Sequence, residues 1–422
     1  MAAAGSHSTR RIHFGRTTAV VRIGLQMKSS EMKALESSEE LSHLVELRRW
    51  FHQHAELSFH EVETAQRITD ELDRLKLPYS YAGEGGGIIA RQILADDAPT
   101  VALRAEMDAL PGKETTGADY ASIYEGAMHV CGHDAHLAMV LGAAALLKKS
   151  PPAGNVTYIF QPAEERGGGS RKMISAGALE NVKAIYAGHV SHEFTIGCIM
   201  VAEGVVTAQS DSFTINVRGQ GGHGARPHET TDAVVIAGFL ITALQTLVSR
   251  EINPLHPSVV TIGQVHSGTA PNVIAEEAML EGTIRTTRAD VRRHIHDGIR
   301  RMAEAAGLLH SASISVDIRK GYPPVVNSKS EAIVARAAVC KILGESAVAA
   351  MQHPSMGSED FSYYLNEIPG CFVRFGARHP DWEPVPLHSP GFDIDERVLP
   401  IGARFFEQVA RYFLDIHSAR DD

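Results

Sequence analysis

The sequence predicts an α/β fold: a central, mainly parallel sheet flanked by helices, interrupted by an inserted ferredoxin-like α+β domain. From Thr100 onward strands alternate with helices, which is typical of a parallel sheet. Between residues 209 and 320 the order becomes strand, helix, strand, strand, helix, strand, which is typical of a ferredoxin-like unit. The alternation then resumes, and 422 residues exceed what one core usually supports. We therefore expect a discontinuous main domain over 31–208 and 321–418, with the insertion at 209–320.

In the main domain, apolar runs predict strands at "TVALRA", "NVTYIF", "KAIYAGH" and "CFVRFGA", with helices at 135–148 and at the C-terminus. Polar residues follow three of these strands: Asp108, Glu164 with Glu165, and His189. Because the carboxyl ends of parallel strands meet at one edge of a sheet, we expect these side chains to form one cluster.

In the insertion, "SFTINVRG" alternates like a strand and "TTDAVVIAGFLITALQTLVSR" predicts a capped, mostly apolar helix. The strands "SVVTIGQV" and "AMLEGTIRT" follow. A helical face and a last strand are then marked by apolar residues at periods of 3.6 and 2, namely Val291, Ile295, Ile299, Met302, Ile314, Val316 and Ile318. "KGYPPVVNS" is the expected return linker to the main domain.

Composition argues for a small-molecule partner. A net charge of -10 and a pI near 6.1 argue against nucleic-acid binding, and we expect no apolar run long enough to span a membrane. The four cysteines are widely spaced, which suggests neither a disulfide framework nor a zinc knuckle and favours a cytoplasmic location. Residues 1–30 are basic, like an organellar transit peptide, but we favour a disordered N-terminal extension upstream of a start at Met27.

In "HVCGHD", His129, Cys131 and His133 fall at alternate positions, so an extended segment would place them on one face. Thiolate and imidazole ligands suit a divalent transition-metal ion. A buried structural cysteine beside surface histidines is the simpler alternative, and a Cys/His nucleophile pair also stays open.

In "FQPAEERGGG", Glu164 and Glu165 are neighbours, and in an extended chain they would point opposite ways. One carboxylate could then hold a metal while the other exchanges protons with the substrate, although most such pairs are solvated surface charge. His189 and His388 offer further imidazoles, and Asp108 could orient one of them.

In "GQGGHGARPH", glycines let the backbone approach another group closely and His223 projects from between them, although a simple glycine-rich turn is the alternative. The sequence contains no HExxH, GxSxG or Walker lysine loop. It therefore gives no support to a zincin, a serine hydrolase or a nucleotide hydrolase that depends on those motifs.

Eight motifs carry a family resemblance, and they run in order from about Leu44 to Glu396: "LRRWFHQHAELSFHE", "ALRAEMDALP", "MHVCGHDAH", "FQPAEE", "GGHGARPH", "APNVIAEEAMLEGTIRT", "GSEDFS" and "LHSPGFDIDE". The sequence resembles the di-metal aminoacylase and carboxypeptidase family, most of all its hippurate hydrolases and plant indole-acetyl-amino-acid hydrolases. The resemblance implies a catalytic domain that binds two divalent metal ions and an inserted lid domain that mediates a homodimer or a higher oligomer.

By position in these motifs, the resemblance implies the site residues. The implied metal ligands are Cys131 as the bridge, His133, Glu165, His189 and His388. Glu164 matches the general base and acid, and His223 matches the histidine that steadies the oxyanion, often across the dimer. Asn272 matches a residue near the substrate carboxylate, and Arg285 is either a further substrate contact or a structural ion pair.

The activity implied is metal-dependent hydrolysis of N-acyl amino acids, with hippurate-like or other aromatic acyl groups, to a carboxylic acid and a free amino acid. A dipeptidase or carboxypeptidase of the same family and a non-catalytic metal-binding scaffold are the alternatives, and the ions could be zinc, manganese or cobalt. Ala55 and Glu106 depart from the family, which commonly has proline and aspartate there. His129, Asp134 and His136 are expected to support the site rather than to bind metal.

Overall fold

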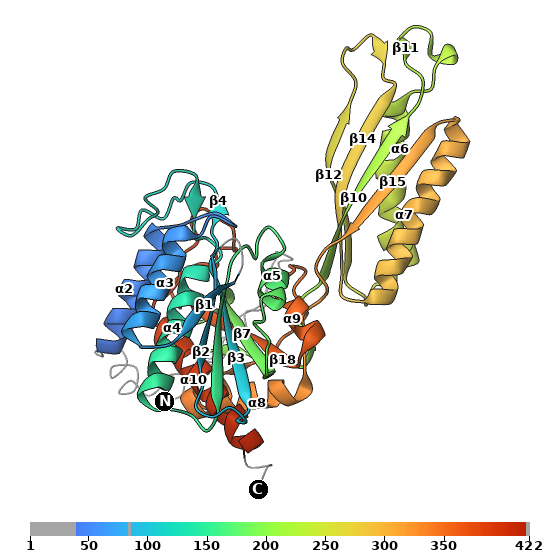
Figure 1. The fold of residues 1–422 in the computed structure, drawn as a ribbon. Helices are drawn as coiled ribbons and strands as arrows, with labels where there is room; N and C mark the ends of the chain where they lie inside the picture. The colour runs from blue at the N-terminus through green and yellow to red at the C-terminus, as the bar shows by residue number, and fades with distance from the viewer. Residues whose placement is uncertain (1–38, 83–85, 419–422) are drawn as a thin grey trace, which may run out of the picture.

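The computed structural model describes residues 39–82 and 86–418, so the predictions for residues 1–30 lie outside the described residues (Figure 1). An eight-stranded sheet with helices on both faces forms one part of the molecule, and a separate four-stranded sheet with two helices forms the other. The predicted α/β class, with a central sheet flanked by helices, is confirmed.

The large sheet has four parallel strands at its centre, β6, β3, β7 and β18. Antiparallel strands β2 and β1 extend it on one side, and β8 with β17 extend it on the other. In spatial order the strands are β1 (Tyr79–Ala82), β2 (Gly87–Gln92), β6 (Asn155–Gln161), β3 (Thr100–Glu106), β7 (Val182–Thr195), β18 (Gly370–Arg378), β8 (Ile199–Met200) and β17 (Val348–Ala349).

Both faces of this sheet are buried, because successive strand side chains point to opposite faces. In β3, Val101 and Leu103 belong to the core that includes residues of α2, α4, α8 and α10, whereas Ala102 belongs to the opposite core that includes residues of α5 and α9. The flanking helices are α2 (Glu39–Gln53), α3 (Val62–Arg74), α4 (His133–Lys149), α5 (Gly169–Ser175), α8 (Lys329–Leu343), α9 (Ser362–Glu367) and α10 (Val398–Ser418).

The second sheet is antiparallel, with spatial order β12, β14, β10, β15, and it has its own hydrophobic core. Its chain order of strand, helix, strand, strand, helix, strand agrees with the pattern read from the sequence. The elements are β10 (Gln209–Arg218), α6 (Ala233–Thr246), β12 (Ser258–Ser267), β14 (Glu277–Thr286), α7 (Ala289–His310) and β15 (Ser313–Lys320). Asp232 caps α6 by accepting hydrogen bonds from the N–H groups of Val234 and Val235.

One expectation about apolar segments is wrong. Among the described residues, Ala233–Glu251, which comprises α6 and a following π-helical turn, is long and apolar enough to cross a membrane by length and composition alone. One face of this segment packs against the four-stranded sheet through buried Ile236, Leu240 and Leu244. A single segment of this length and composition is weak evidence of membrane insertion.

Short two-stranded pairs lie outside the two larger sheets: one follows the carboxyl end of β3, one lies beside the start of β18, and one lies at the tip of the insertion. They are β4 (Leu110–Pro111) with β5 (Ala127–Met128), β9 (Gly204–Val205) with β16 (Val326–Asn327), and β11 (Gly222–His223) with β13 (Val273–Ile274). Asp108 and Glu164 follow the ends of β3 and β6, as predicted. His189 was expected beyond its strand, but it lies inside β7, which continues past the end of β3.

Candidate metal centre

The residues predicted as metal ligands gather at one edge of the large sheet. Their ligand atoms form two overlapping groups, each within 4.8 Å: one contains Cys131, His133 and His189, and the other contains Cys131, Glu165 and His388. Cys131 Sγ lies 3.3 Å from His189 Nε2 and 3.4 Å from His388 Nε2, and His388 Nε2 lies 3.3 Å from Glu165 Oε1. Because both groups share Cys131, its thiol stands where a ligand bridging two ions would stand.

The donor atoms have the chemistry that divalent cations require. His133 Nδ1 donates to the carbonyl of Asp108 at 2.8 Å and His189 Nδ1 donates to the carbonyl of Val190 at 2.8 Å, so the lone pair that each ring offers to a cation, when the ring is not protonated, lies on Nε2. Burial, together with the nearby His136, lowers the pKa of His189 well below its ordinary value and keeps the ring neutral. His133 Nε2 and Glu165 Oε1 are buried without a hydrogen bond, which is costly unless a cation binds them.

A tight turn, and not an extended segment, brings Cys131 and His133 together. Gly132 has φ 84°, in the left-handed region, and His133 begins α4. The predicted extended geometry of "HVCGHD" is therefore wrong, although its two ligands do converge. His129 belongs to none of the candidate ligand groups; it is buried, with its ring 6.2 Å from that of His52.

The two neighbouring glutamates also converge. Ala163 has φ 51°, so the chain turns just before them, and the carboxylates of Glu164 and Glu165 both lie within 4.8 Å of a His133 nitrogen. The prediction that they point opposite ways is wrong, because it assumed an extended backbone. The Asp108 carboxylate accepts hydrogen bonds from both of their N–H groups, each at 3.1 Å, and so fixes this turn.

Asp108 is itself held in place. Ser58 Oγ donates to Asp108 Oδ2 at 2.7 Å, and His133 Nδ1 lies 3.5 Å from Asp108 Oδ1. Burial alone would raise the pKa of Asp108, but the hydrogen bonds from His133 and Ser58 lower it below its ordinary value, so the side chain is an anion. The predicted contact between Asp108 and an imidazole is present, mainly through the backbone carbonyl of Asp108.

Glu164 lies in an unusually acidic environment. Its ligand atom is within 4.8 Å of those of Glu359 and Asp360, and all three residues are buried. Burial, with the nearby carboxylates of Glu359 and Asp360, raises the pKa of Glu164 well above its ordinary value. A carboxyl group with a raised pKa is suited to taking up and returning a proton.

A buried arginine balances these acids. Arg104 on β3 contacts Glu106, and it donates to Glu359 Oε1 at 3.0 Å and to Asp360 Oδ1 at 2.8 Å. Glu106, the departure from the family pattern, also accepts a hydrogen bond from His136 Nδ1 at 2.9 Å. Glu106 thus supports the site through its hydrogen bond with His136. A supporting role is what the sequence predicts for His136.

Three predicted residues lie on the insertion, and two of them are remote from the ligand cluster. His223 and Asn272 are exposed neighbours on β11 and beside β13, and Figure 1 shows β11 at the tip of the insertion, far from the large sheet. Arg285 lies at the near end of β14 and donates to Ser358 Oγ at 2.7 Å. No ion pair of Arg285 is found among the described residues, so the suggested structural ion pair is not supported.

Several residues that support the site were not predicted from the sequence. Ser58 and Glu61 lie in the motif "HAELSFHE", which was quoted without a role; Glu61 Oε1 accepts a hydrogen bond from the N–H of Ala163 at 2.8 Å and so holds the strained turn. Arg104, Glu359 and Asp360 also lie in quoted motifs. The signal in the sequence that could have indicated these residues is their polar character beside apolar residues of the same motifs.

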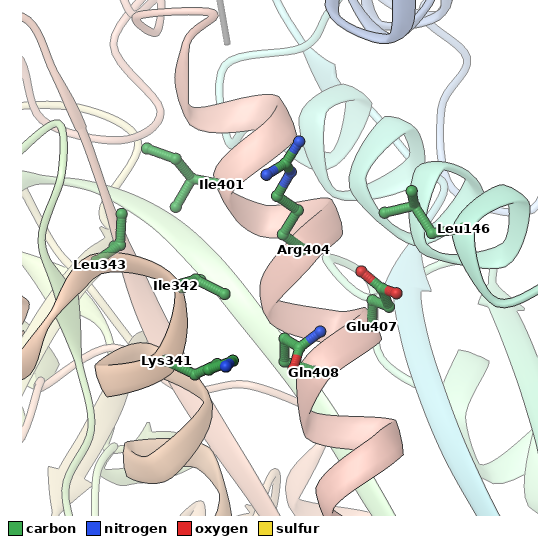
Figure 2. Close-up of a pocket in the computed structure, with 8 residues that line it drawn as sticks. All are labelled: Leu146, Lys341, Ile342, Leu343, Ile401, Arg404, Glu407 and Gln408. Atoms are coloured by element: carbon green, nitrogen blue, oxygen red, sulfur yellow. The ribbon is translucent and has the colours of Figure 1, made fainter. Parts of the chain in front are cut away.

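A separate hollow of about 390 Å³ opens between α4, α8 and α10 (Figure 2). Leu146, Ile342, Leu343 and Ile401 line it together with charged and amide side chains. None of the candidate ligands contributes to its lining, so it is distinct from the candidate metal centre.

Known proteins share this fold and these motifs. A family model described as peptidase family M20/M25/M40 matches residues 102–412. The N-acetylcysteine deacetylase of Bacillus subtilis (strain 168) is 37% identical over 380 residues, which cover 88% of this chain and 97% of that protein. The IAA-amino acid hydrolase ILR1-like 4 of Arabidopsis thaliana is 38% identical over 384 residues, which cover 89% of this chain and 87% of that protein.

A solved structure is also similar to this chain. The Bacillus subtilis YXEP protein, described as a dinuclear metal binding peptidase from the M20 family, superposes with a TM-score of 0.77 and 33% identity over 89% of this chain and 98% of its own. Together with the candidate ligand groups, these relatives support divalent metal binding and confirm the predicted metal-dependent hydrolysis of amide bonds. They favour this activity over a cysteine hydrolase or a non-catalytic scaffold. The chain belongs to peptidase family M20/M25/M40.

Proposed function

We propose that this enzyme hydrolyses N-acyl amino acids to a carboxylic acid and a free amino acid. The observation that carries the proposal is the convergence of a proton-exchanging carboxylate, Glu164, with the two overlapping ligand groups at one sheet edge. The names of two relatives, a deacetylase of N-acetylcysteine and a hydrolase of IAA-amino acids, support a substrate in which an acyl group is joined to an amino acid by an amide bond. Acetyl, benzoyl and indole-acetyl groups are the acyl classes we propose.

We assign one cation to Cys131, His133 and His189 and a second to Cys131, Glu165 and His388. When bound, the two ions would supply Lewis acidity that polarises an amide carbonyl and lowers the pKa of a water molecule. The thiolate favours zinc or cobalt, whereas the carboxylate would also tolerate manganese. The raised pKa of a buried thiol is no obstacle, because a cation replaces its proton on binding.

In this proposal Glu164 is the general base and then the general acid. Its carboxylate takes a proton from the attacking water and returns it to the nitrogen of the leaving amino acid. The N–H of Asp360 donates to Glu164 Oε1 at 3.3 Å and leaves Oε2 to accept that proton. Asp108 keeps the Glu164–Glu165 turn fixed while the charge moves.

His223 is the proposed donor to the carbonyl oxygen as it gains negative charge. Its Nδ1 accepts a hydrogen bond from the N–H of Ala225 at 3.0 Å, so a neutral ring carries its proton on Nε2. This side chain is exposed at the tip of the insertion, where it could reach the site of a second subunit. Asn272 beside it is proposed to bind the substrate carboxylate in the same way.

The insertion offers an apolar surface for such a dimer. Val234, Val235 and Phe239 on α6 are 50%, 57% and 43% exposed, and Val265 on the edge strand β12 is 45% exposed. Neighbouring exposed apolar residues on one domain are typical of a protein interface. We therefore propose that two chains pair through their insertions.

A mixing experiment tests the shared site. We expect His223→Ala and Glu164→Gln proteins to be nearly inactive separately and to recover activity after subunit exchange, up to about a quarter of the wild-type value, because half the dimers would contain one intact site of two. The measurement is amino-acid release before and after mixing, with dimers counted by light scattering. Absence of recovery in confirmed mixed dimers would place the donor within the same chain.

A substrate panel tests the function itself. Release of free amino acid is measured for acetyl, benzoyl and indole-acetyl amino acids and for dipeptides, before and after chelation, with zinc, manganese and cobalt restored separately. We expect chelator-sensitive turnover of at least one N-acyl class. Turnover of dipeptides alone would identify a dipeptidase, and turnover that survives complete metal removal would contradict the proposed mechanism.

The compartment is a further part of the proposal. All four cysteines are free in the structure, as expected for a protein of a reducing compartment. We therefore propose a cytoplasmic location for this enzyme.

A further inference from the structure

Besides the bond from its N–H to Asp108, Glu164 is held by hydrogen bonds from two distant parts of the chain. The hydroxyl of Tyr322 donates to the backbone carbonyl of Glu164 at 2.7 Å, and the N–H of Asp360 donates to its carboxylate Oε1 at 3.3 Å. The first bond holds the peptide unit and the second holds the side chain. Together they set the direction in which the carboxylate points.

The contact from Asp360 is anchored in the large sheet. The Asp360 carboxylate accepts hydrogen bonds from Arg104 Nη2 at 2.8 Å, from Gln161 Nε2 at 2.9 Å and from the N–H of Ser170 at 3.1 Å. All four residues are fully buried, on or beside β3, β6 and α5. This contact therefore belongs to the rigid catalytic part of the molecule.

The contact from Tyr322 belongs to the junction with the insertion. Tyr322 comes two residues after the end of β15 at Lys320, and its carbonyl accepts a hydrogen bond from the N–H of Ser210 on β10 at 3.1 Å. The N–H of Gly321 donates to the carbonyl of Ser210 at 3.0 Å. The two chain crossings between the domains are thus joined at Tyr322.

Asp211 ties this junction to a helix of the insertion. One Asp211 carboxylate oxygen accepts a hydrogen bond from the N–H of Gly321 at 3.0 Å. The other accepts from Arg292 Nε at 2.7 Å and from His296 Nε2 at 2.6 Å, and both donors lie on α7. The backbone before Tyr322 must therefore follow any change in the orientation of the insertion.

The turn after Glu165 closes around the Tyr322 hydroxyl. Gly167 has φ 72°, and its N–H approaches the Glu164 carbonyl at 3.4 Å. A Cβ atom at Gly167 would lie only 2.9 Å from the Tyr322 oxygen. The hydroxyl and the glycine turn are therefore closely fitted, and a shift of Tyr322 must move the Glu164 peptide.

We propose that Tyr322 is a positioning residue that couples the orientation of the insertion to the carboxylate of Glu164. The inference rests on the proposed role of Glu164 as general base and adds to it a mechanical link. The bonds of Glu164 to Asp108 and Asp360 stay with the large sheet, whereas the bond from Tyr322 moves with the insertion. Substrate held between the two domains would then align the base only when the insertion is correctly placed.

Tyr322→Phe tests the link, because it removes one oxygen atom and keeps the ring. We expect kcat to fall on the order of tenfold, with KM and bound metal little changed, because the lost hydrogen bond serves alignment and not binding. Tyr363→Phe is the matched control: the two rings lie 6.0 Å apart, but the Tyr363 hydroxyl contacts Arg171. That control should keep wild-type kinetics and metal content.

The outcomes separate this inference from the proposed function. If the wild-type protein turns over no N-acyl amino acid or dipeptide, the proposed function fails before any variant is compared. If the wild type is active and Tyr322→Phe has the same kcat, only the inference fails. A parallel loss of bound metal in Tyr322→Phe would also overturn it, because the residue would then support the whole centre.

A double-mutant cycle gives an independent test if Tyr322→Phe alone is ambiguous. Asp211→Asn weakens the tie between Gly321 and α7 without changing a residue that contacts Glu164 or a candidate ligand. We expect it to lower kcat severalfold in the otherwise wild-type protein and to have little further effect when combined with Tyr322→Phe. Independent, additive effects of the two substitutions would contradict coupling through Tyr322.

Discussion

Glu164→Gln is expected to abolish nearly all turnover while both metal ions stay bound. Glutamine has the same shape and can still accept the hydrogen bond from the N–H of Asp360, but it cannot take up a proton at neutral pH. A positioned general base contributes roughly 10²–10⁴-fold to rate, and a loss of about that size is expected in kcat. Steady-state kinetics with metal analysis on the same sample measures both quantities.

The thermal stability of Glu164→Gln is a second expected result. Glu164 is buried within 4.8 Å of the acids Glu359 and Asp360, and burial together with these carboxylates raises its pKa. Removing an ionisable group from that cluster relieves repulsion, so Glu164→Gln should melt at the same temperature as the wild type or higher. A variant that is inactive because it unfolds would show the opposite shift.

Glu165→Gln is the matched control, because the same chemical change falls on the neighbouring residue. Its Oε1 is buried without a hydrogen bond and belongs to a ligand group, so this variant should lose bound metal as well as activity. Wild-type turnover in Glu164→Gln, or loss of metal from it, would contradict the division of roles between the two glutamates.

The order of strands and helices was predictable because apolar residues recur in each segment at the period of a strand or of a helix. In β3 and β15 apolar residues follow the spacing that burial requires, and in α7 Val291, Ile295 and Ile299 are all buried as the helical period predicts. The strands β1 and β2 were not predicted: β2 is apolar, but both are short and lie outside the βαβ alternation that guided the reading.

The gathering of the candidate ligands was predictable, but their local geometry was not. Strand ends and motif positions brought Cys131, His133 and Glu165 to one place, as parallel-sheet topology requires. The directions of the side chains depended on positive φ at Gly132 and Ala163, and a non-glycine residue such as Ala163 gives no local signal of that conformation. An extended backbone, which the predictions assumed, is absent at those two turns.

Hydrogen-bond partners that lie far apart in the sequence could not be predicted, for a different reason. Tyr322 and Glu164 are 158 positions apart, and Arg104 and Asp360 are 256 apart, so no local period relates them. Their pairing is decided by how the return linker and the loop before α9 cross the sheet edge. The motifs "KGYPP" and "GSEDFS" marked the places without indicating the partners.

Cys131→Ala is expected to remove both cations, whereas His388→Ala should remove only one. The reason is geometric: Cys131 belongs to both ligand groups, and His388 belongs to one of them. Loss of the metal contribution to the transition state, several kcal/mol, should lower kcat on the order of a thousandfold or more in Cys131→Ala. Metal per chain, measured after dialysis at controlled free zinc, distinguishes the two variants even where neither has measurable activity.

The control for thiol chemistry is Cys198→Ala, which removes a free, partly exposed cysteine that belongs to none of the ligand groups and should leave metal content and rate unchanged. Cys131→Ser adds a second comparison, because an oxygen ligand suits zinc less than a thiolate does but remains acceptable to manganese. If Cys131→Ala kept both ions, the shared thiol would not be a bridge. The two groups would then be separate sites, and the chemistry assigned to a paired centre would have to be carried by one ion with Glu164.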